Sequence, residues 1–352
     1  MQSRILGKTG LKTADIGMGC WPIGGLASNL GMGIGWEGVD ADLALRALHL
    51  GYDLGVTYFD TADVYGLGQS ERLIGLLTQQ VSRETLIIGS KVGYYRGTSS
   101  HPYHPVNMRN QIEVSLSNLN TDYLDIYDFH NIYFGENNEY RDSAIETMHR
   151  FQEEGKIRFV GLRFGHQYSP HKKMGKDTEG ETDRFLDLAA RIQPDIIKTH
   201  FNLLTPLDFS SRFDLFEWAQ QQQIGLVFNK PFEQGALLQK YHHMTPPIFD
   251  ERDIRQGKIW FSAAYIKILN KYMGKIQSVY GGDPRELIRI CVQYSLYHYK
   301  DSITLCGFKT PSQVEMNHAA HNKPLTKEEV GFIKGVMSEL HEEISNYEAE
   351  KT

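Results

Sequence analysis

Four residues in this chain could together move protons to and from a substrate. They are Asp60, Tyr65, Lys91 and His130, each close behind a short apolar run. A tyrosine hydroxyl ionises near pH ~10, so it needs charged neighbours before it can exchange a proton at neutral pH. A lysine beside it can supply that charge, a carboxylate can hold the lysine, and a histidine can donate to a substrate oxygen. The set therefore favours chemistry on a polarised carbonyl that is ready to accept a hydride.

Eight short apolar runs, separated by segments with helical spacing, must position these side chains. We expect strands near residues 15–18, 56–59, 85–89, 123–129, 157–161, 195–199, 224–228 and 302–305. The helical segments are 41–50, 70–77, 107–119, 143–154, 183–192 and 213–222. Eight strands that alternate with helices predict an α/β fold, a closed (β/α)8 TIM barrel. The four residues follow its second, third and fourth strands, so they should meet at the C-terminal mouth of the barrel.

Three further segments fit around such a barrel. The turn residues of 6–11 predict an N-terminal β-hairpin that closes the bottom. Residues 231–284 predict a long top-face insertion with a helical part at 259–279, in a place where lids over active sites occur. Residues 325–348 are amphipathic and charged, so we expect a C-terminal helical tail over 325–352. Because no linker-like break divides the sequence, residues 1–352 are expected to form one domain.

Composition and charge argue against several classes of function. Lys and Arg total 37 against 43 for Asp and Glu, the formal charge is -6, and no basic stripe indicates binding to nucleic acid or an anionic membrane. The sequence lacks a signal-peptide pattern and any run near ~18 apolar residues, which predicts a cytoplasmic protein. Cys20, Cys291 and Cys306 lack metal-ligand spacing, so neither zinc nor a disulfide framework is expected. The expected partner is a small-molecule substrate, and a homo-oligomer stays open.

Several motifs surround the four residues. Residues 60–71 read D-T-A-x-x-Y-G-x-G-x-S-E, 115–125 read S-L-x-x-L-x-T-D-Y-L-D, 155–158 read G-K-I-R, and 307–317 read G-x-x-x-x-x-Q-x-x-x-N. In this combination, over about residues 3–325, the chain resembles the aldo-keto reductases. The resemblance implies four roles: Tyr65 as general acid/base, Lys91 as the group that lowers its pKa, Asp60 as the orienting carboxylate, and His130 as the donor that orients the carbonyl. Each residue alone could equally be structural.

The resemblance also implies a nicotinamide cofactor. No G-x-G-x-x-G follows a strand, so a Rossmann domain is not expected, but the family binds its cofactor extended across the barrel mouth. Gly307, Lys309, Gln313 and Asn317 match the adenosine and phosphate end of that site, beside the start of a short predicted helix. Lys309 could meet a 2'-phosphate, which favours NADP(H) over NAD(H). Lys240 matches a pyrophosphate-side lysine of some relatives, although it could equally be a surface lysine.

At the nicotinamide end the sequence departs from the family pattern. The usual Gly-Val-Ser-Asn is Gly-Leu-Arg-Phe at 161–164, and the usual glutamine of the sixth strand is Lys198. The seventh strand ends in Asn229 and Lys230. We assign Arg163, Lys198, Asn229 and Lys230 to the cofactor site, with altered contacts, and expect the added cations to lie at the mouth.

Three functions are compatible with this pattern. The first is an NADP(H)-dependent oxidoreductase that acts on a carbonyl or alcohol, with the extra cations receiving a sugar-like or anionic substrate. The second is a dehydratase or epimerase that reuses the four residues for redox-neutral proton transfer. The third is a non-catalytic regulatory subunit, like the potassium-channel beta subunits of the same fold. We favour the first, because it keeps more of the family's features intact.

The loops behind the barrel strands should form the substrate pocket, since these loops build the top face of a barrel. They carry the candidates Trp21, Tyr94 and Asn131, with Tyr95, Tyr133 and Phe134 beside them. Aromatic walls suit sugar rings and apolar carbonyls equally, so the sequence leaves the substrate open.

Overall fold

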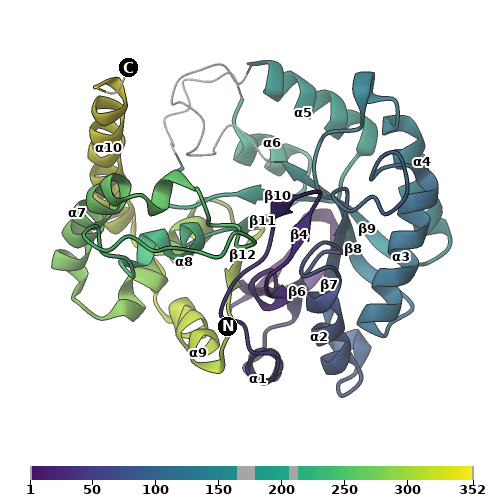
Figure 1. Cartoon of the computed structure of the whole chain (residues 1–352), viewed down its shortest axis with the longest axis horizontal. Coiled ribbons are helices and arrows are strands. Elements are labelled where there is room, and N and C mark those ends of the chain that lie inside the picture. Colours follow the sequence, from purple (N-terminus) through teal and green to yellow (C-terminus); the bar gives the residue numbers. More distant parts are fainter. Residues whose placement is uncertain (1, 165–178, 206–212, 351–352) are drawn as a thin grey trace.

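The chain folds around a closed barrel of eight parallel strands. A computed structural model describes residues 2–164, 179–205 and 213–350, and Figure 1 shows the barrel with helices arranged around it. In ring order the strands are β3 (Ile16–Gly19), β6 (Tyr58–Asp60), β7 (Ile87–Val92), β8 (Leu124–Phe129), β9 (Ile157–Phe164), β10 (Ile196–His200), β11 (Gly225–Asn229) and β12 (Ser302–Gly307). Pairing of β12 with β3 closes the ring. The predicted (β/α)8 TIM barrel is confirmed.

Helices connect the strands and cover the outer wall of the barrel. They are α1 (Ala41–Asp53), α2 (Gln69–Thr78), α3 (Pro105–Leu119), α4 (Arg141–Glu153), α5 (Glu179–Ile192), α6 (Leu215–Gln221), α8 (Pro284–Tyr297) and α9 (Pro311–Ala319). The helices α1 to α6 lie where helical spacing predicts them. Helix α8 was not expected, because its segment follows the long insertion and carries no motif.

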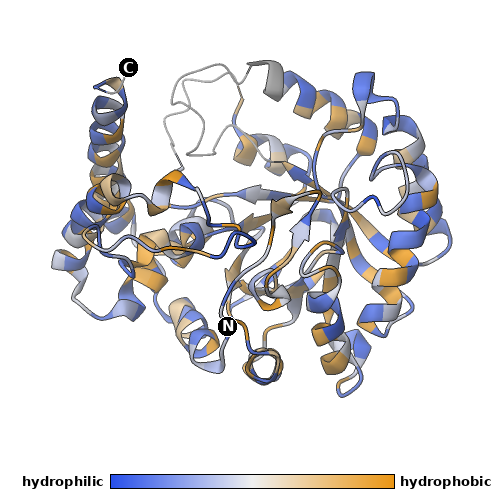
Figure 2. Ribbon diagram, viewed as in Figure 1, coloured by the Kyte–Doolittle hydropathy of each residue, from blue (hydrophilic) through white to orange (hydrophobic). Residues whose placement is uncertain are grey.

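Helix α1 illustrates why the sequence forms these elements. The Asp40 side chain accepts a hydrogen bond from the Leu43 backbone N–H at 2.8 Å, which satisfies a donor that the helix leaves unpaired. Ala44, Ala47 and Leu48 are buried and lie three and four residues apart, so one stripe of the helix packs on the barrel. Figure 2 shows a similar mixture of hydrophilic and hydrophobic positions on the other helices around the barrel.

A hairpin closes the bottom of the barrel, as the turn residues predict. Its strands, β1 (Ser3–Ile5) and β2 (Lys12–Ala14), pair antiparallel. Leu6 and Leu11 between them are buried in a cluster with apolar side chains of β6, β8 and β11. Gly7 has a φ of +51°, and a Cβ there would lie 2.3 Å from a backbone oxygen in the loop before β11, so the close approach requires glycine.

The inserted segment and the tail pack against each other. After β11 the chain forms the 3-10 helices η5 (Glu233–Leu238) and η6 (Ile259–Phe261), then α7 (Ala263–Tyr280). The helix expected over 259–279 therefore begins later, behind a 3-10 turn. The expected tail helix is α10 (Lys327–Ala349), which packs on α7 through hydrogen bonds such as Tyr272 Oη to Glu343 at 2.6 Å.

Two smaller features complete the description. A short antiparallel pair, β4 (Ser28–Asn29) and β5 (Met32–Gly33), follows β3 and was not predicted, because two-residue strands leave no pattern. Within residues 2–164, 179–205 and 213–350, no helix combines the length and apolar composition that crossing a bilayer needs.

Candidate active site

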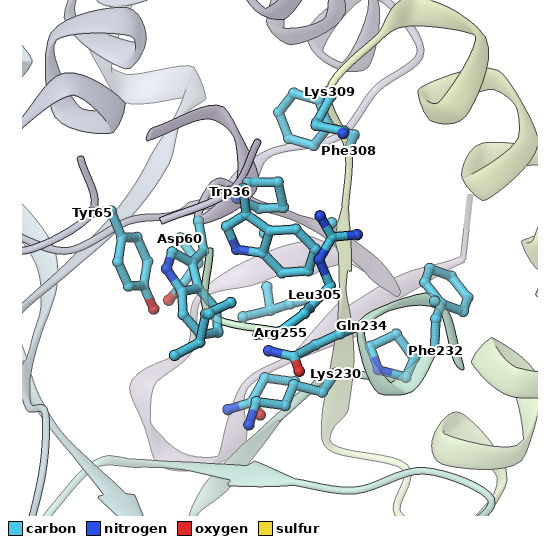
Figure 3. A pocket seen from close by; sticks show the side chains of 18 of the residues that line it. Trp36, Asp60, Tyr65, Lys230, Phe232, Gln234, Arg255, Leu305, Phe308 and Lys309 are labelled. Atoms are coloured by element: carbon cyan, nitrogen blue, oxygen red, sulfur yellow. The ribbon is translucent and has the colours of Figure 1, made fainter. Parts of the chain in front are cut away.

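A cavity of about 570 Å³ opens at the C-terminal ends of the barrel strands. Asp60, Tyr65, Lys91 and His130 all line it, from the ends of β6, β7 and β8 and the turn after β6. The structure thus brings the four predicted residues together, and Figure 3 shows Asp60 and Tyr65 on one side of the cavity. The volume is typical of a small-molecule site, and the mouth of the barrel is where such folds place their active sites.

Tyr65 lies in the turn after β6 with its ring against two neighbours. It stacks on Trp21 with ring centroids 5.6 Å apart, and Nζ of Lys91 lies 4.8 Å from the centroid of its ring. Burial raises the pKa of Tyr65 above its ordinary value, and Asp60 raises it further. The hydroxyl is therefore protonated at neutral pH and can donate a proton. Among the cations, Arg163 opposes this rise in pKa most strongly. The role of Lys91 in lowering the pKa of Tyr65 therefore stays a prediction.

Lys91 and Asp60 form a buried ion pair beside Tyr65. Nζ of Lys91 lies 2.5 Å from Oδ1 of Asp60 and also donates to the backbone carbonyl of Thr61. Burial by itself would raise the pKa of Asp60, but Lys198 and Lys91 hold it below its ordinary value. Burial lowers the pKa of Lys91, against the attraction of Asp60. Asp60 is therefore ionised, and it fixes the position of the lysine.

His130 follows β8 and lies against two tyrosine rings. Its ring centroid is 5.7 Å from that of Tyr65 and 4.7 Å from that of Tyr94. Burial lowers the pKa of His130 well below its ordinary value, and the charges of Lys91 and Arg163 lower it further. The imidazole is therefore neutral at neutral pH, and it keeps one N–H that can donate to a substrate oxygen beside Tyr65.

Lys198 lies inside the barrel beneath the cavity, and it is absent from the cavity's lining. Its side chain is fully buried, its Nζ contacts Oδ2 of Asp60, and the same nitrogen lies 2.6 Å from Oδ2 of Asp128. Burial opposes the charged form of Lys198, yet Asp128 and Asp60 raise its pKa well above the ordinary value. The expectation that Lys198 adds positive charge to the mouth is wrong, because two carboxylates neutralise it inside the barrel.

Two glycines leave room for the buried ion pair of Lys198 and Asp128. A Cβ on Gly89 would lie 3.0 Å from Nζ of Lys198, and a Cβ on Gly161 would lie 1.8 Å from Oδ1 of Asp128. Burial raises the pKa of Asp128, and Lys198 opposes that rise. Lys91 and Lys198 thus share the barrel interior with two aspartates, and we call the four side chains Asp60, Lys91, Asp128 and Lys198 the buried charge network.

Gly307, Lys309, Gln313 and Asn317 lie at the turn from β12 into α9 and line the cavity together. The Lys309 backbone N–H donates to Oε1 of Gln313 at 2.7 Å, and Nδ2 of Asn317 donates to the Gly307 carbonyl at 3.1 Å. Nζ of Lys309 donates to the backbone carbonyl of Glu37 at 3.0 Å. In Figure 3, Lys309 lies on the opposite side of the cavity from Lys230.

The remaining residues assigned to the cofactor from sequence are Arg163, Asn229, Lys230 and Lys240, and they also line the cavity. Nη1 of Arg163 donates to the Tyr94 hydroxyl at 3.3 Å and to the backbone carbonyl of His130 at 3.4 Å. Their contacts with a cofactor stay predictions. In the described ranges, no group of three or more His, Cys, Asp or Glu side chains could hold a metal ion.

The loop residues proposed for the substrate pocket divide into two groups. Trp21 and Tyr94 line the cavity, whereas Asn131 is not among its lining residues. Nδ2 of Asn131 donates to the Gly93 carbonyl at 2.5 Å and its Oδ1 accepts from the Tyr133 N–H at 2.8 Å. Asn131 therefore shapes the loop after β8, while the neighbouring Tyr133 is exposed and is not among the residues that line the cavity.

Sequence reasoning missed several lining residues. They are Trp36, Gln234, Arg255, Lys258 and Phe308. Arg255 pairs with Asp253 at 2.7 Å, and its guanidinium carbon lies 4.7 Å from the ring centroid of Trp36. The insertion at 231–284 was expected to cover the site, but Arg255 and Lys258 lie before its predicted helical part, where no periodicity or motif could identify them.

Relatives with known names support an oxidoreductase. L-galactose dehydrogenase from Arabidopsis thaliana is 26% identical over 349 residues, which cover 97% of this chain and 93% of that protein. L-glyceraldehyde 3-phosphate reductase from Escherichia coli (strain K12) is 29% identical over 271 residues, which cover 73% of this chain and 68% of that protein. Both names describe enzymes that oxidise or reduce a substrate.

Solved structures show the same fold. A glycerol dehydrogenase from Gluconobacter oxydans aligns with a TM-score of 0.73 at 20% identity, covering 96% of this chain and 95% of that one. An aldo/keto reductase from Klebsiella pneumoniae, solved with NADP and acetate, aligns with a TM-score of 0.63 at 21% identity, covering 95% of each chain. The sequence model of the Aldo/keto reductase family matches residues 15–337. With this match and the mouth of the barrel as described, the chain belongs to the aldo/keto reductase family of oxidoreductases.

Proposed function

We propose that this protein is an NADP(H)-dependent oxidoreductase that interconverts a carbonyl and an alcohol on a sugar-like or anionic small molecule. The observation that carries this is the meeting of Tyr65, Lys91 and His130 on one cavity that continues to Lys309. One wall offers a proton donor and a hydrogen-bond donor for a carbonyl oxygen. The rest of the cavity is lined by the cations Lys240, Arg255 and Lys309, which suit the phosphate groups of a dinucleotide.

The four predicted residues divide the work of carbonyl reduction. A bound nicotinamide would supply the hydride. The neutral His130 ring donates its N–H to the carbonyl oxygen and so positions it. Tyr65, which is protonated at neutral pH, gives its proton to that oxygen as negative charge develops. Lys91, held by Asp60, then lies close enough to stabilise the phenolate that remains.

The far end of the cavity supports NADP(H). Lys309, Lys240 and Arg255 line it, and Trp36 and Phe308 add aromatic surface. Three cations suit the pyrophosphate and the 2'-phosphate of the cofactor, because charge-assisted contacts to phosphate are strong. The Klebsiella pneumoniae structure was solved with NADP, which agrees with this proposal for the present chain.

The names of two relatives support a sugar-like or anionic substrate. One acts on L-galactose, a sugar, and the other on L-glyceraldehyde 3-phosphate, a phosphorylated aldehyde. The cytoplasmic location remains a prediction, as does the expectation that the chain binds neither nucleic acid nor membranes, and a homo-oligomeric state stays open.

A redox-neutral dehydratase or epimerase is the second candidate. It is favoured by one observation: Arg163 and Lys230 replace the uncharged residues that the family uses at the nicotinamide end. Without a nicotinamide, Tyr65 and Lys91 could still move a proton beside a carbonyl. A purely regulatory role has less support, since all four residues of the proton-transfer site face the cavity.

Titration of the protein with NADPH, followed by the fluorescence of the nicotinamide, separates these candidates. We expect saturable binding, together with oxidation of the bound NADPH when small aldehydes are added. Binding without turnover on any carbonyl would favour the regulatory role. No binding at about 1 mM, where the affinity is only about 4 kcal/mol, would contradict the oxidoreductase.

A further inference from the structure

The cavity is lined by more cations than carboxylates although the chain as a whole has a negative formal charge. Its lining includes seven Lys or Arg side chains, at positions 91, 163, 230, 240, 255, 258 and 309, and one carboxylate, that of Asp60. The formal charge of the whole chain is -6. A cleft that gathers one sign of charge between low-dielectric walls attracts ligands of the opposite sign. The lining of the cavity therefore favours the binding of anionic ligands.

These cations form two separate groups besides Lys91. Lys240, Arg255 and Lys309 make up the group at the far end, which we propose for the cofactor: burial lowers the pKa values of Lys240 and Lys309, and the charge of Arg255 lowers both further. Arg163, Lys230 and Lys258 make up a second group: burial lowers the pKa values of Lys230 and Lys258, and the charge of Arg163 lowers both further. In Figure 3 the labelled members Lys309 and Lys230 lie on opposite sides of the cavity, with Arg255 between them.

The second group adjoins the catalytic residues. Nη1 of Arg163 lies 3.4 Å from the backbone oxygen of His130 and 3.3 Å from the hydroxyl of Tyr94. The charge of Arg163 also contributes to the pKa shifts of His130 and Tyr65, which places it within electrostatic reach of both. An anion held here would lie next to the site of carbonyl chemistry.

The second group has few anionic partners of its own. In the described part of the chain, no carboxylate lies within 4.0 Å of the charged nitrogens of Arg163, Lys230 or Lys258. Nζ of Lys258 donates to the neutral Oε1 of Gln234 at 2.7 Å. The charge of Glu233 raises the pKa of both lysines, and Oε2 of Glu233 lies 2.7 Å from Nε2 of His200.

Confinement of these cations carries a cost that an anion would remove. Burial lowers the pKa of Lys230, and Arg163 lowers it further. Burial lowers the pKa of Lys258 to about 7, and Lys230 and Arg163 contribute to the shift. Three half-buried cations that repel one another are stabilised when a ligand brings negative charge between them.

We propose that Arg163, Lys230 and Lys258 form a subsite for a phosphate or carboxylate group of the substrate, which holds the reacting carbonyl against Tyr65 and His130. The inference rests on the proposed function, because it treats the far group as the phosphate site of the cofactor. The same chemistry could serve the cofactor's pyrophosphate, and the experiment below distinguishes the two sources.

The test is a calorimetric titration with inorganic phosphate, with and without saturating NADPH, on the wild-type protein, Lys258→Gln, Lys230→Gln and the control Lys267→Gln. Lys267 is exposed on α7 and outside the cavity lining, so its variant changes net charge equally. We expect the NADPH-loaded protein to bind phosphate, and each subsite variant to weaken this binding by about tenfold, in line with the loss of one charge-assisted contact. The control should bind as wild type does.

The outcomes separate the inference from the proposed function. If NADPH blocks phosphate binding, or if Lys258→Gln weakens NADPH and leaves phosphate binding unchanged, the group serves the cofactor and the substrate subsite is refuted. If phosphate binds wild type and both subsite variants equally, the subsite is also refuted. If NADPH fails to bind at all, the proposed function fails, while the same variants still test the anion subsite in the unloaded protein.

Discussion

Tyr65 is the residue on which the proposed chemistry depends most. Tyr65→Phe removes the hydroxyl and keeps the ring that stacks on Trp21. We expect turnover to fall by about 10²–10⁴-fold, the usual effect of losing a general acid, with NADPH affinity within about twofold of wild type. Steady-state rates and cofactor titration on the same preparations measure both. A variant that turns over like wild type would remove Tyr65 from the mechanism.

Lys309 tests the choice between the two nicotinamide cofactors. Its Nζ is held by a backbone carbonyl and has no carboxylate partner within the described ranges, so it is available to a 2'-phosphate. Lys309→Ala should weaken NADPH by about 1.5–3 kcal/mol, the value of one charge-assisted contact, and leave NADH almost unchanged. Dissociation constants for both cofactors provide the comparison. Equal weakening of both would place the lysine away from that phosphate.

The pKa of Lys258 makes anion binding dependent on pH. Burial, together with the charges of Lys230 and Arg163, lowers this pKa to about 7, against the opposing effect of Glu233 and Asp253. An anion prefers the protonated lysine, so affinity should be constant below about pH 7 and fall above it. Sulfate is the suitable probe, because its charge does not change in this range. Lys258→Arg, which stays charged, should abolish the decline, whereas a decline that persists in this variant would exclude Lys258 as its source.

At the scale of single residues, the sequence predicted the site residues that follow strands and missed those in the insertion. Asp60, Lys91 and His130 were found because a parallel strand ends at the mouth of a barrel whatever surrounds it. Lys258 reaches the cavity through an irregular segment, and no local pattern encodes where such a segment turns.

The barrel strands carry the buried charge network, which the sequence alone did not reveal. Lys198 on β10 contacts Asp60 on β6, which is 138 residues away in the chain. The sequence places Lys198 in a strand but does not show whether its side chain points into the barrel or away from it. Nor does the sequence show that Gly89 leaves space for Lys198 and Gly161 leaves space for Asp128. The prediction of a free cation therefore failed, because charge pairing across a barrel depends on side chains from four strands.

The buried charge network should act as one unit in stability. Lys198→Met leaves Asp60 and Asp128 near each other with one lysine fewer, and losing one partner of a buried ion pair costs about 3–5 kcal/mol. The double variant Lys198→Met with Asp128→Asn removes one charge of each sign, so it should be less destabilised than the single variant. Urea unfolding of the three proteins measures this. A double variant that is at least as destabilised as Lys198→Met would contradict this dependence of the two charges on each other.

At the scale of the whole molecule, the alternation of eight strands with helices was enough to predict the fold. Strand ends differ from the prediction by a few residues, as for β9, which continues to Phe164. The hairpin under the barrel and the tail were recognisable from turn residues and amphipathic spacing. We infer that residues 1–352 form one domain, because α10 packs on α7 and α7 braces the cavity wall through Asn270 and Tyr241.

The whole arrangement predicts transfer of a hydride from cofactor to substrate at one end of a positively charged cavity. The most direct test uses NADPH deuterated at the transferable position of the nicotinamide, with neutral and phosphorylated sugar aldehydes as substrates, followed by mass spectrometry of the products. The account predicts alcohols that carry the deuterium of the cofactor, formed faster from the phosphorylated aldehydes. Products that carry no deuterium from the cofactor, with NADPH unconsumed, would contradict it and favour redox-neutral proton transfer.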